Sequence, residues 1–190
     1  MMKRDAALEI LARHYADGIV VPVYQSAFDW MAIRPHPLNY LCTGAMGQAV
    51  SHALGLALGC PEEKVVVLDG DGSVLMNLGG LATLARYRPK NLLHVIFDNG
   101  SLLSTGGFET HTTHGVTDLA HVARGAGIEH VDDVDSVMAF GEAAVAALER
   151  DDLSVIVARV KAVGPDNYGM DLALPENAFR FKRCVQERKA

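Results

Sequence analysis

The stretch that decides the fold reads Val65-Val66-Val67-Leu68-Asp69-Gly70-Asp71-Gly72-Ser73. Its apolar first half predicts a buried strand, and the polar, glycine-containing second half predicts a turn. The same pattern returns where the apolar run 92–97 leads into Asp98-Asn99-Gly100. A helical stretch lies between the two strands, so we expect them to run parallel and their turns to lie side by side.

These two turns together predict a pocket for a metal-bound diphosphate. Ligands of open parallel sheets bind beyond the carboxyl ends of the strands, which is where this chain places Asp71 and Asn99. Their oxygens suit Mg2+, which takes only one or two carboxylates and leaves other positions to water and ligand phosphate. Gly70 and Gly72 let backbone N–H groups approach an anion without a Cβ in the way.

The ordered combination of motifs resembles thiamine diphosphate (ThDP) enzymes, in which Gly-Asp-Gly is followed by an Asn at the end of the next strand. Further matches are Thr43 to Ala49 upstream and Ser104 to Gly107 downstream. Over about residues 41–127 the chain is similar to sulfopyruvate and phosphonopyruvate decarboxylases. It most resembles the beta subunit of two-subunit sulfopyruvate decarboxylases.

The resemblance implies the cofactors ThDP and Mg2+. The metal ligands it implies are the Asp71 carboxylate, the Asn99 side-chain oxygen and the Ser101 backbone carbonyl. Asp98 stands where many members carry a first Asn, and it is expected beside the metal. The implied cofactor-binding residues are Thr43, Gly44, Ala45, Met46, Gly70, Asp71, Gly72, Ser73, Asn99, Ser101, Leu102 and Leu103.

Two of these residues receive particular roles from the resemblance. The loop at Gly44 offers a backbone carbonyl to the aminopyrimidine ring, and Met46 supports the bent form of the cofactor. An unbranched thioether fills such a gap well.

The resemblance also implies that half of the active site lies on another chain. In ThDP enzymes, the glutamate that activates the aminopyrimidine comes from a second domain across an interface. Glu9 lies on a predicted amphipathic helix, Glu62 and Glu63 precede a strand, and Glu109 lies on a loop, so none fits this role. We therefore expect a separate alpha subunit, an alpha/beta hetero-oligomer, and no certain catalytic residue in this chain.

The implied substrate is a short 2-oxo acid with a second anionic end. The first choice is 3-sulfopyruvate, which would yield sulfoacetaldehyde and CO2. His111 and His114 lie in the long polar loop 100–115 and are possible contacts for the anionic end when protonated. A solvated loop is the alternative role for both histidines.

Several alternatives stay open. A phosphonopyruvate decarboxylase subunit would use the same cofactor half, and an acetolactate synthase-like carboligase would form a carbon–carbon bond with a second oxo acid. A non-catalytic cofactor-binding or regulatory subunit would keep the fold without the chemistry. A dinucleotide-binding domain is disfavoured because Gly70-Asp71-Gly72 lacks the third glycine of that fingerprint.

Composition narrows the class of protein. The length of 190 residues and the hydrophobic content of 49% predict one core and one domain, residues 1–190. A net charge of -6 without a basic run argues against nucleic acid as a partner. No apolar run resembles a secretory signal or a membrane span. Cys42, Cys60 and Cys184 form no disulfide framework, which is typical of a reducing cytoplasm.

The order of elements predicts a doubly wound parallel α/β sheet with helices on both faces. Strands are expected at 19–23, 39–42, 65–68, 92–97, 129–131 and 153–160, and helices at 4–15, 26–34, 49–59, 73–86, 117–126, 135–149 and 175–189. Pro22 favours a sheet edge or a strand end, and Ser26 is a candidate helix cap. His94 is expected to be a hydrogen-bonded core residue. The acidic cluster Asp132-Asp133-Asp135 is expected to cap a helix.

Overall fold

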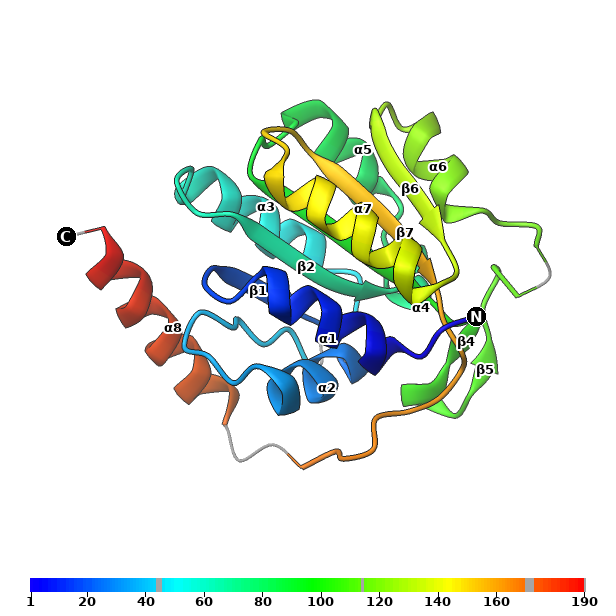
Figure 1. The fold of residues 1–190 in the computed structure, drawn as a ribbon, viewed down its shortest axis with the longest axis horizontal. Coiled ribbons are helices and arrows are strands. Elements are labelled where there is room, and N and C mark those ends of the chain that lie inside the picture. The colour runs from blue at the N-terminus through cyan, green and yellow to red at the C-terminus, as the bar shows by residue number, and fades with distance from the viewer. Residues whose placement is uncertain (44–45, 114, 170–172, 190) are drawn as a thin grey trace.

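A parallel sheet of five strands forms the centre of the computed structural model, which describes residues 1–43, 46–113, 115–169 and 173–189. The strand order is β1-β2-β3-β7-β6 (Figure 1). These strands are β1 (Ile19–Pro22), β2 (Val65–Gly70), β3 (Leu92–Asp98), β6 (His130–Val134) and β7 (Ser154–Arg159). A short antiparallel pair, β4 (Ser101–Leu102) and β5 (Phe108–Glu109), follows β3 and is joined by a 3-10 turn (Leu103–Thr105).

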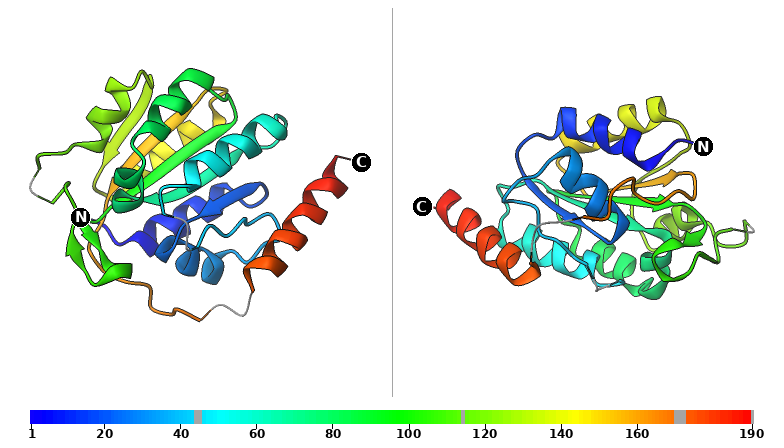
Figure 2. Two further views of the ribbon diagram at one scale, coloured as in Figure 1. Left: turned by 180° about the vertical axis from the view of Figure 1, so that it is seen from behind. Right: turned by 90° about the horizontal axis from the view of Figure 1, so that it is seen from below.

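Helices cover both faces of the sheet, as Figure 2 shows, so the predicted doubly wound fold is confirmed. One face carries α1 (Arg4–His14), α2 (Gln25–Ile33) and α7 (Val137–Glu149). The other carries α3 (Ala49–Gly59), α4 (Asp71–Met76), α5 (Gly79–Tyr87), α6 (Leu119–Gly125) and α8 (Leu174–Arg188). Alternate residues of β2 point to opposite faces, so Val66 joins one core cluster and Val67 the other.

The edge position of β1 agrees with the expectation for Pro22. Beyond β1, the expected strand 39–42 is reduced to isolated bridges at Asn39 and Cys42. The buried Asn39 side chain instead accepts hydrogen bonds from Trp30 Nε1 at 2.9 Å and Arg34 Nη1 at 3.2 Å. Backbone hydrogen bonds from Tyr40 N to the Val20 carbonyl at 2.8 Å and from Cys42 N to the Pro22 carbonyl at 3.1 Å also tie this segment to β1, so a short parallel pairing remains.

The prediction of a single helix at 73–86 is wrong. Helix α4 begins at Asp71 and ends at Met76, and α5 begins at Gly79. Asn77 leaves the helical conformation at φ -148°, and its Nδ2 donates to the backbone carbonyl of Gly47 at 2.8 Å. This tertiary hydrogen bond stabilises the break, and Leu78 is 38% exposed instead of packing in the core.

The prediction that the acidic cluster caps a helix is wrong for two of its members. Asp132 and Asp133 lie within β6, and Asp133 pairs with Arg159 at 2.7 Å. Ser136 caps α7, because its side chain accepts from the backbone N–H of Ala139 at 3.3 Å.

Two further expectations differ from the structure. Ser26 is not the cap of α2, because that helix begins at Gln25 with Tyr24 in the N-cap position. His94 is buried as expected, but among the described residues neither of its ring nitrogens has a hydrogen-bond partner. Its Nε2 lies 3.4 Å from Oδ2 of the buried Asp69.

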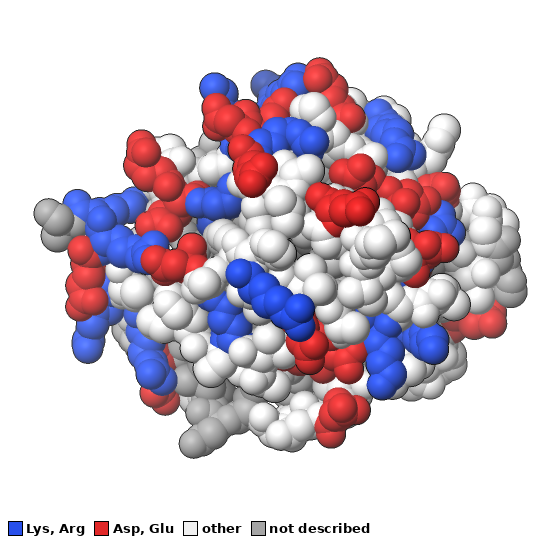
Figure 3. All heavy atoms as spheres, viewed as in Figure 1, with Lys and Arg blue, Asp and Glu red and all other residues white. Residues whose placement is uncertain are grey.

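The face drawn in Figure 3 gives little indication of function. Basic and acidic side chains are interspersed on it, with uncharged areas between them. Within the described ranges, each helix is too short or too polar to traverse a lipid bilayer.

The cysteines give a first testable prediction. Cys42 and Cys60 are buried and Cys184 is half-buried. Burial raises the pKa of the Cys42 thiol to about 11, so the thiolate that reacts with disulfide reagents is scarce at pH 8. We expect such a reagent to label Cys184 in the folded protein and to label the other two only after unfolding, as counted by mass spectrometry.

A control variant accompanies this labelling. Cys184→Ser should remove the label from the folded protein, whereas equal labelling of all three thiols in the folded protein would contradict the burial.

Because the pKa of folded Cys42 lies above its ordinary value, its contribution to stability is present below about pH 8.5. That contribution is lost as the pH rises towards 11.

Candidate functional site

The carboxyl ends of β1, β2 and β3 meet in one cleft, which we call the diphosphate cleft. It is lined by residues 23–26 after β1, residues 70–73 from the end of β2 into α4, residue 97 near the end of β3, residues 99 and 101–104 after β3, and by Arg4 and Met46. The two turns singled out in the sequence therefore do lie side by side. The edge at which they meet is the one where open parallel sheets bind ligands.

Most of the expected cofactor residues line this cleft. They are Met46, Gly70, Asp71, Gly72, Ser73, Asn99, Ser101, Leu102 and Leu103. Thr43 is not among the lining residues, and Gly44 and Ala45 lie outside the described residues. The role of each residue in binding a cofactor stays a prediction.

The floor of the cleft packs closely against the loop after β3. A Cβ atom added to Gly72 would lie 2.2 Å from Cδ2 of Leu102, so glycine is the residue that fits between α4 and the loop after β3. Asp71 and Gly72 form the first turn of α4. Backbone N–H groups of such a turn have no acceptor within the helix and favour an anion.

Asp71 is the central charged group of the cleft and is only 2% exposed. Thr110 Oγ1 donates to its Oδ2 at 2.5 Å, and Thr112 Oγ1 lies 3.3 Å from the same oxygen. Thr112 also donates to Asp98 Oδ1 at 2.7 Å, so it links the two carboxylates. Burial, reinforced by the charge of Asp98, raises the pKa of Asp71 above its ordinary value, although the threonine hydrogen bonds oppose the shift.

This donor set fits a hard divalent cation. A buried carboxylate with a second carboxylate nearby is destabilised, and a bound cation would relieve that cost. Asn99 Oδ1 accepts from the Ser101 N–H at 2.8 Å and, as an amide oxygen, has a second lone pair for a metal. Gly100, at φ +65°, makes the turn that brings Asn99 and Ser101 together.

The loop that carries Met46 is fastened to α4. Ser73 Oγ accepts from the Gly47 N–H at 2.9 Å, and Asn77 Nδ2 donates to the Gly47 carbonyl at 2.8 Å. These two bonds hold the loop against the floor and place Met46 at the rim of the cleft.

One wall of the cleft was not predicted from the sequence. Tyr24, Gln25 and Ser26 follow β1 at the start of α2, and Arg4 reaches the same wall from α1. Tyr24 has φ +46°, which is rare for a residue other than glycine and marks a tight turn at this edge. The carboxyl end of the predicted strand 19–23 was the available signal, because it lies at the same edge of the sheet as those of β2 and β3.

Thr110 and Thr112 were missed as well, because only the folded loop brings them to Asp71. His111, between them in sequence, is exposed and is not among the residues that line the cleft. His114 lies outside the described residues. A substrate contact by either histidine stays a prediction.

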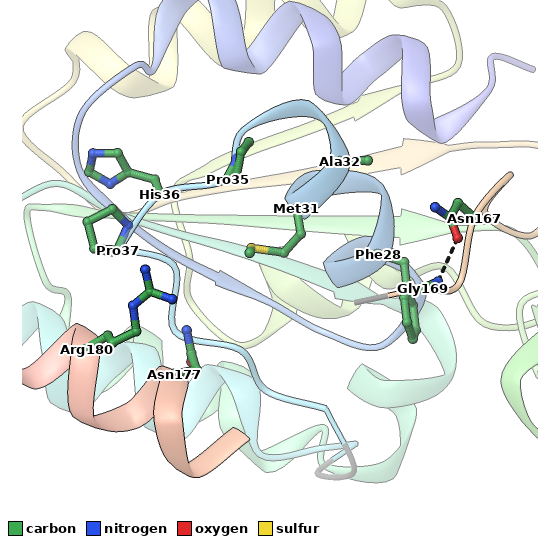
Figure 4. Close-up of a pocket in the computed structure, with 10 residues that line it drawn as sticks. All are labelled: Phe28, Met31, Ala32, Pro35, His36, Pro37, Asn167, Gly169, Asn177 and Arg180. Atoms are coloured by element: carbon green, nitrogen blue, oxygen red, sulfur yellow. Dashed lines mark hydrogen bonds between the residues drawn. The ribbon is translucent and has the colours of Figure 1, made fainter. Parts of the chain in front are cut away.

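Two other features are separate from this cleft. A cavity of about 390 Å3 lies between α2, the segment 35–37 and α8, with Met31, His36 and Arg180 among its lining residues (Figure 4). It shares no lining residue with the diphosphate cleft. The polar atoms of Asn177 at its edge are already bonded to the backbone of Asn39 and Leu41.

The second feature is a cluster of Glu129, His130 and Asp152 with metal-ligand spacing. Arg88 donates to both of its carboxylates, at 2.7 to 3.0 Å, and these bonds hold the pKa of Asp152 at about 2. The cluster is therefore an ion-pair network with its own cation.

Comparison with known proteins decides the family. The thiamine pyrophosphate enzyme family, C-terminal TPP binding domain, matches residues 22–158. The chain belongs to this family. The match includes most of the diphosphate cleft, so this is a domain of the kind that binds ThDP (thiamine pyrophosphate).

Three proteins illustrate what this chain is similar to. The sulfopyruvate decarboxylase subunit beta of Methanocaldococcus jannaschii is 42% identical, over 81% of this chain and 80% of its own length. The phosphonopyruvate decarboxylase of Streptomyces viridochromogenes is 37% identical, over 96% of this chain and 46% of its own length. The solved 2-oxoglutarate:ferredoxin oxidoreductase of Magnetococcus marinus has the same fold, with a TM-score of 0.73 at 16% identity, over 95% of this chain and 66% of its own.

Proposed function

We propose that this chain is the diphosphate-binding beta subunit of a ThDP-dependent decarboxylase that acts on a short anionic 2-oxo acid. The observation that carries the proposal is the cleft that joins the buried Asp71, Asn99 and the first turn of α4 at the carboxyl ends of β2 and β3. The whole chain, residues 1–190, would then act as one ThDP-binding domain.

In this proposal, the chain holds the diphosphate through Mg2+ and through its backbone. Asp71, the Asn99 amide oxygen and the Ser101 carbonyl would hold the metal, which leaves further positions to phosphate oxygens. The first turn of α4 would face the negative charge. Leu102 and Leu103 would cover the cofactor from the β4 side and exclude water. Bound ThDP would supply the electron sink for loss of the carboxylate.

We propose that a separate alpha subunit completes the site. Among the described residues that line the diphosphate cleft, none is a glutamate. The group that activates the aminopyrimidine would therefore come from the partner. The similar chain from M. jannaschii is itself named a subunit beta, which supports an alpha/beta assembly.

We propose 3-sulfopyruvate as the first substrate to test, with 3-phosphonopyruvate as the second candidate. The two named relatives point to these two acids, one each. Both acids carry a carboxylate that leaves as CO2 and a second anion at the other end. An acetolactate synthase-like carboligase and a non-catalytic subunit remain as alternatives.

The substrate test uses this chain together with its partner, ThDP and Mg2+. We expect CO2 and sulfoacetaldehyde from 3-sulfopyruvate, with kcat/KM at least about tenfold above that for 3-phosphonopyruvate, a difference of about 1.4 kcal/mol. CO2 release is followed by a coupled assay, and the aldehyde is identified by mass spectrometry.

The products separate the alternatives. The reverse preference would assign the chain to phosphonopyruvate decarboxylation. A new carbon–carbon bond with a second oxo acid would indicate a carboligase. ThDP binding without turnover of any 2-oxo acid would indicate a non-catalytic subunit.

A further inference from the structure

The Gln25 side chain has an unsatisfied donor group at the diphosphate cleft. Gln25 is 8% exposed and is the first residue of α2. Its Oε1 accepts from Arg4 Nη1 at 3.3 Å, whereas its Nε2 has no hydrogen-bond partner among the described residues. A buried amide donor without an acceptor is costly, so its presence at a cleft indicates an acceptor that binds there.

Arg4 determines which end of this amide faces the ligand. A guanidinium can only donate hydrogen bonds, so Arg4 must face the carbonyl oxygen of Gln25 and not its NH2 group. Arg4 is itself fixed, because its Nε donates to Asp29 Oδ2 at 2.7 Å and the two side chains are only 6% and 10% exposed. The chain of contacts Asp29–Arg4–Gln25 therefore orients the amide with its donors away from Arg4.

The surroundings of Gln25 favour an anion as the acceptor. Helix α2 spans nine residues, and the positive end of its dipole lies where Gln25 and Ser26 line the cleft. The charge of Arg4, which also lines the cleft, is paired with the carboxylate of Asp29. Gly70, Asp71 and Gly72 line the same cleft, so a diphosphate held at this turn would lie in the cleft that Gln25 also lines.

We propose that Arg4 is a positioning residue that holds the Gln25 amide so that Nε2 donates to the terminal phosphate of ThDP. The proposal rests on the proposed function, and it assigns a role to two residues outside the Gly-Asp-Gly motif. Arg4 lies on α1, which packs beside α2, so the first helix of the chain would contribute to recognition of the diphosphate.

The test compares ThDP with thiamine monophosphate, which lacks the terminal phosphate. Binding of each compound with Mg2+ is measured by calorimetry on the full chain with its partner. Gln25→Ala is expected to weaken ThDP binding about tenfold or more and to change monophosphate binding less than about twofold. Arg4→Met is expected to give the same selective loss, and Arg4→Lys, which keeps a donor and the charge opposite Asp29, should recover part of it.

A double-mutant cycle separates positioning from general damage to the fold. If Arg4 acts through Gln25, Arg4→Met should add less than about twofold to the loss of ThDP affinity in the Gln25→Ala background. An equal loss for both compounds, or an undiminished effect of Arg4→Met in that background, would overturn the inference. A wild-type chain that binds neither compound would overturn the proposed function as well, whereas wild-type binding with no effect of Gln25→Ala overturns the inference alone.

Discussion

Asp71→Ala is expected to abolish Mg2+-dependent binding of ThDP, with a loss of about 100-fold or more in affinity, or about 2.7 kcal/mol. Asp71 is the buried carboxylate at the centre of the cleft, and its charge is the one a divalent cation would neutralise most directly. The measurement is calorimetric titration of ThDP at saturating Mg2+.

Asp71→Asn is the matched variant for this prediction. It keeps the size of the side chain and an oxygen that accepts from Thr110, but it removes the charge. Because burial raises the pKa of Asp71, the metal-free fold is favoured when this group is neutral, and that contribution is lost as the pH rises. We therefore expect Asp71→Asn to lose Mg2+ and ThDP at pH 7 while its Tm without metal stays equal or rises. Retained metal-dependent binding in both variants would remove Asp71 from the metal site.

The second large effect is the dependence of turnover on a partner chain. With ThDP and Mg2+ but no partner, this chain is expected to show no decarboxylation above the background of free ThDP. Addition of the alpha subunit should restore turnover, because the glutamate that activates the aminopyrimidine is expected there. The measurement is CO2 release as the ratio of alpha to beta chains is varied, and the activity should saturate at a fixed ratio.

One control links this requirement to the cleft. The alpha subunit mixed with Asp71→Ala should stay inactive although the two chains still associate, as judged by size-exclusion chromatography. Full turnover by the isolated beta chain would contradict the division of the site between two subunits.

The sequence was sufficient to locate the floor of the site. Four successive apolar residues at 65–68 specify a buried strand, and the glycines and Asp71 after them specify a sharp polar turn. The repeated pattern at 92–100 then places Asn99 beside Asp71, because parallel neighbouring strands end at the same edge. These local signals are strong, and the fold follows from them.

The wall formed by Arg4 and Gln25 could not be found in the same way. Its geometry depends on a contact between α1 and α2, and nothing in the local sequence of either helix specifies it. Asn77 illustrates the same limit. The helix break there is stabilised by a hydrogen bond to Gly47, thirty positions earlier in the chain, whereas the surrounding leucines favour one continuous helix.

Titration of ThDP into the wild-type chain together with its partner, once with Mg2+ and once with EDTA, tests the central claim most directly. The account predicts saturable binding with Mg2+, one ThDP per chain, and a loss of at least about 100-fold in affinity when the metal is removed. Absence of binding in the presence of both Mg2+ and the partner, or binding that is equally tight in EDTA, would contradict a metal-bridged diphosphate site at Asp71 and Asn99.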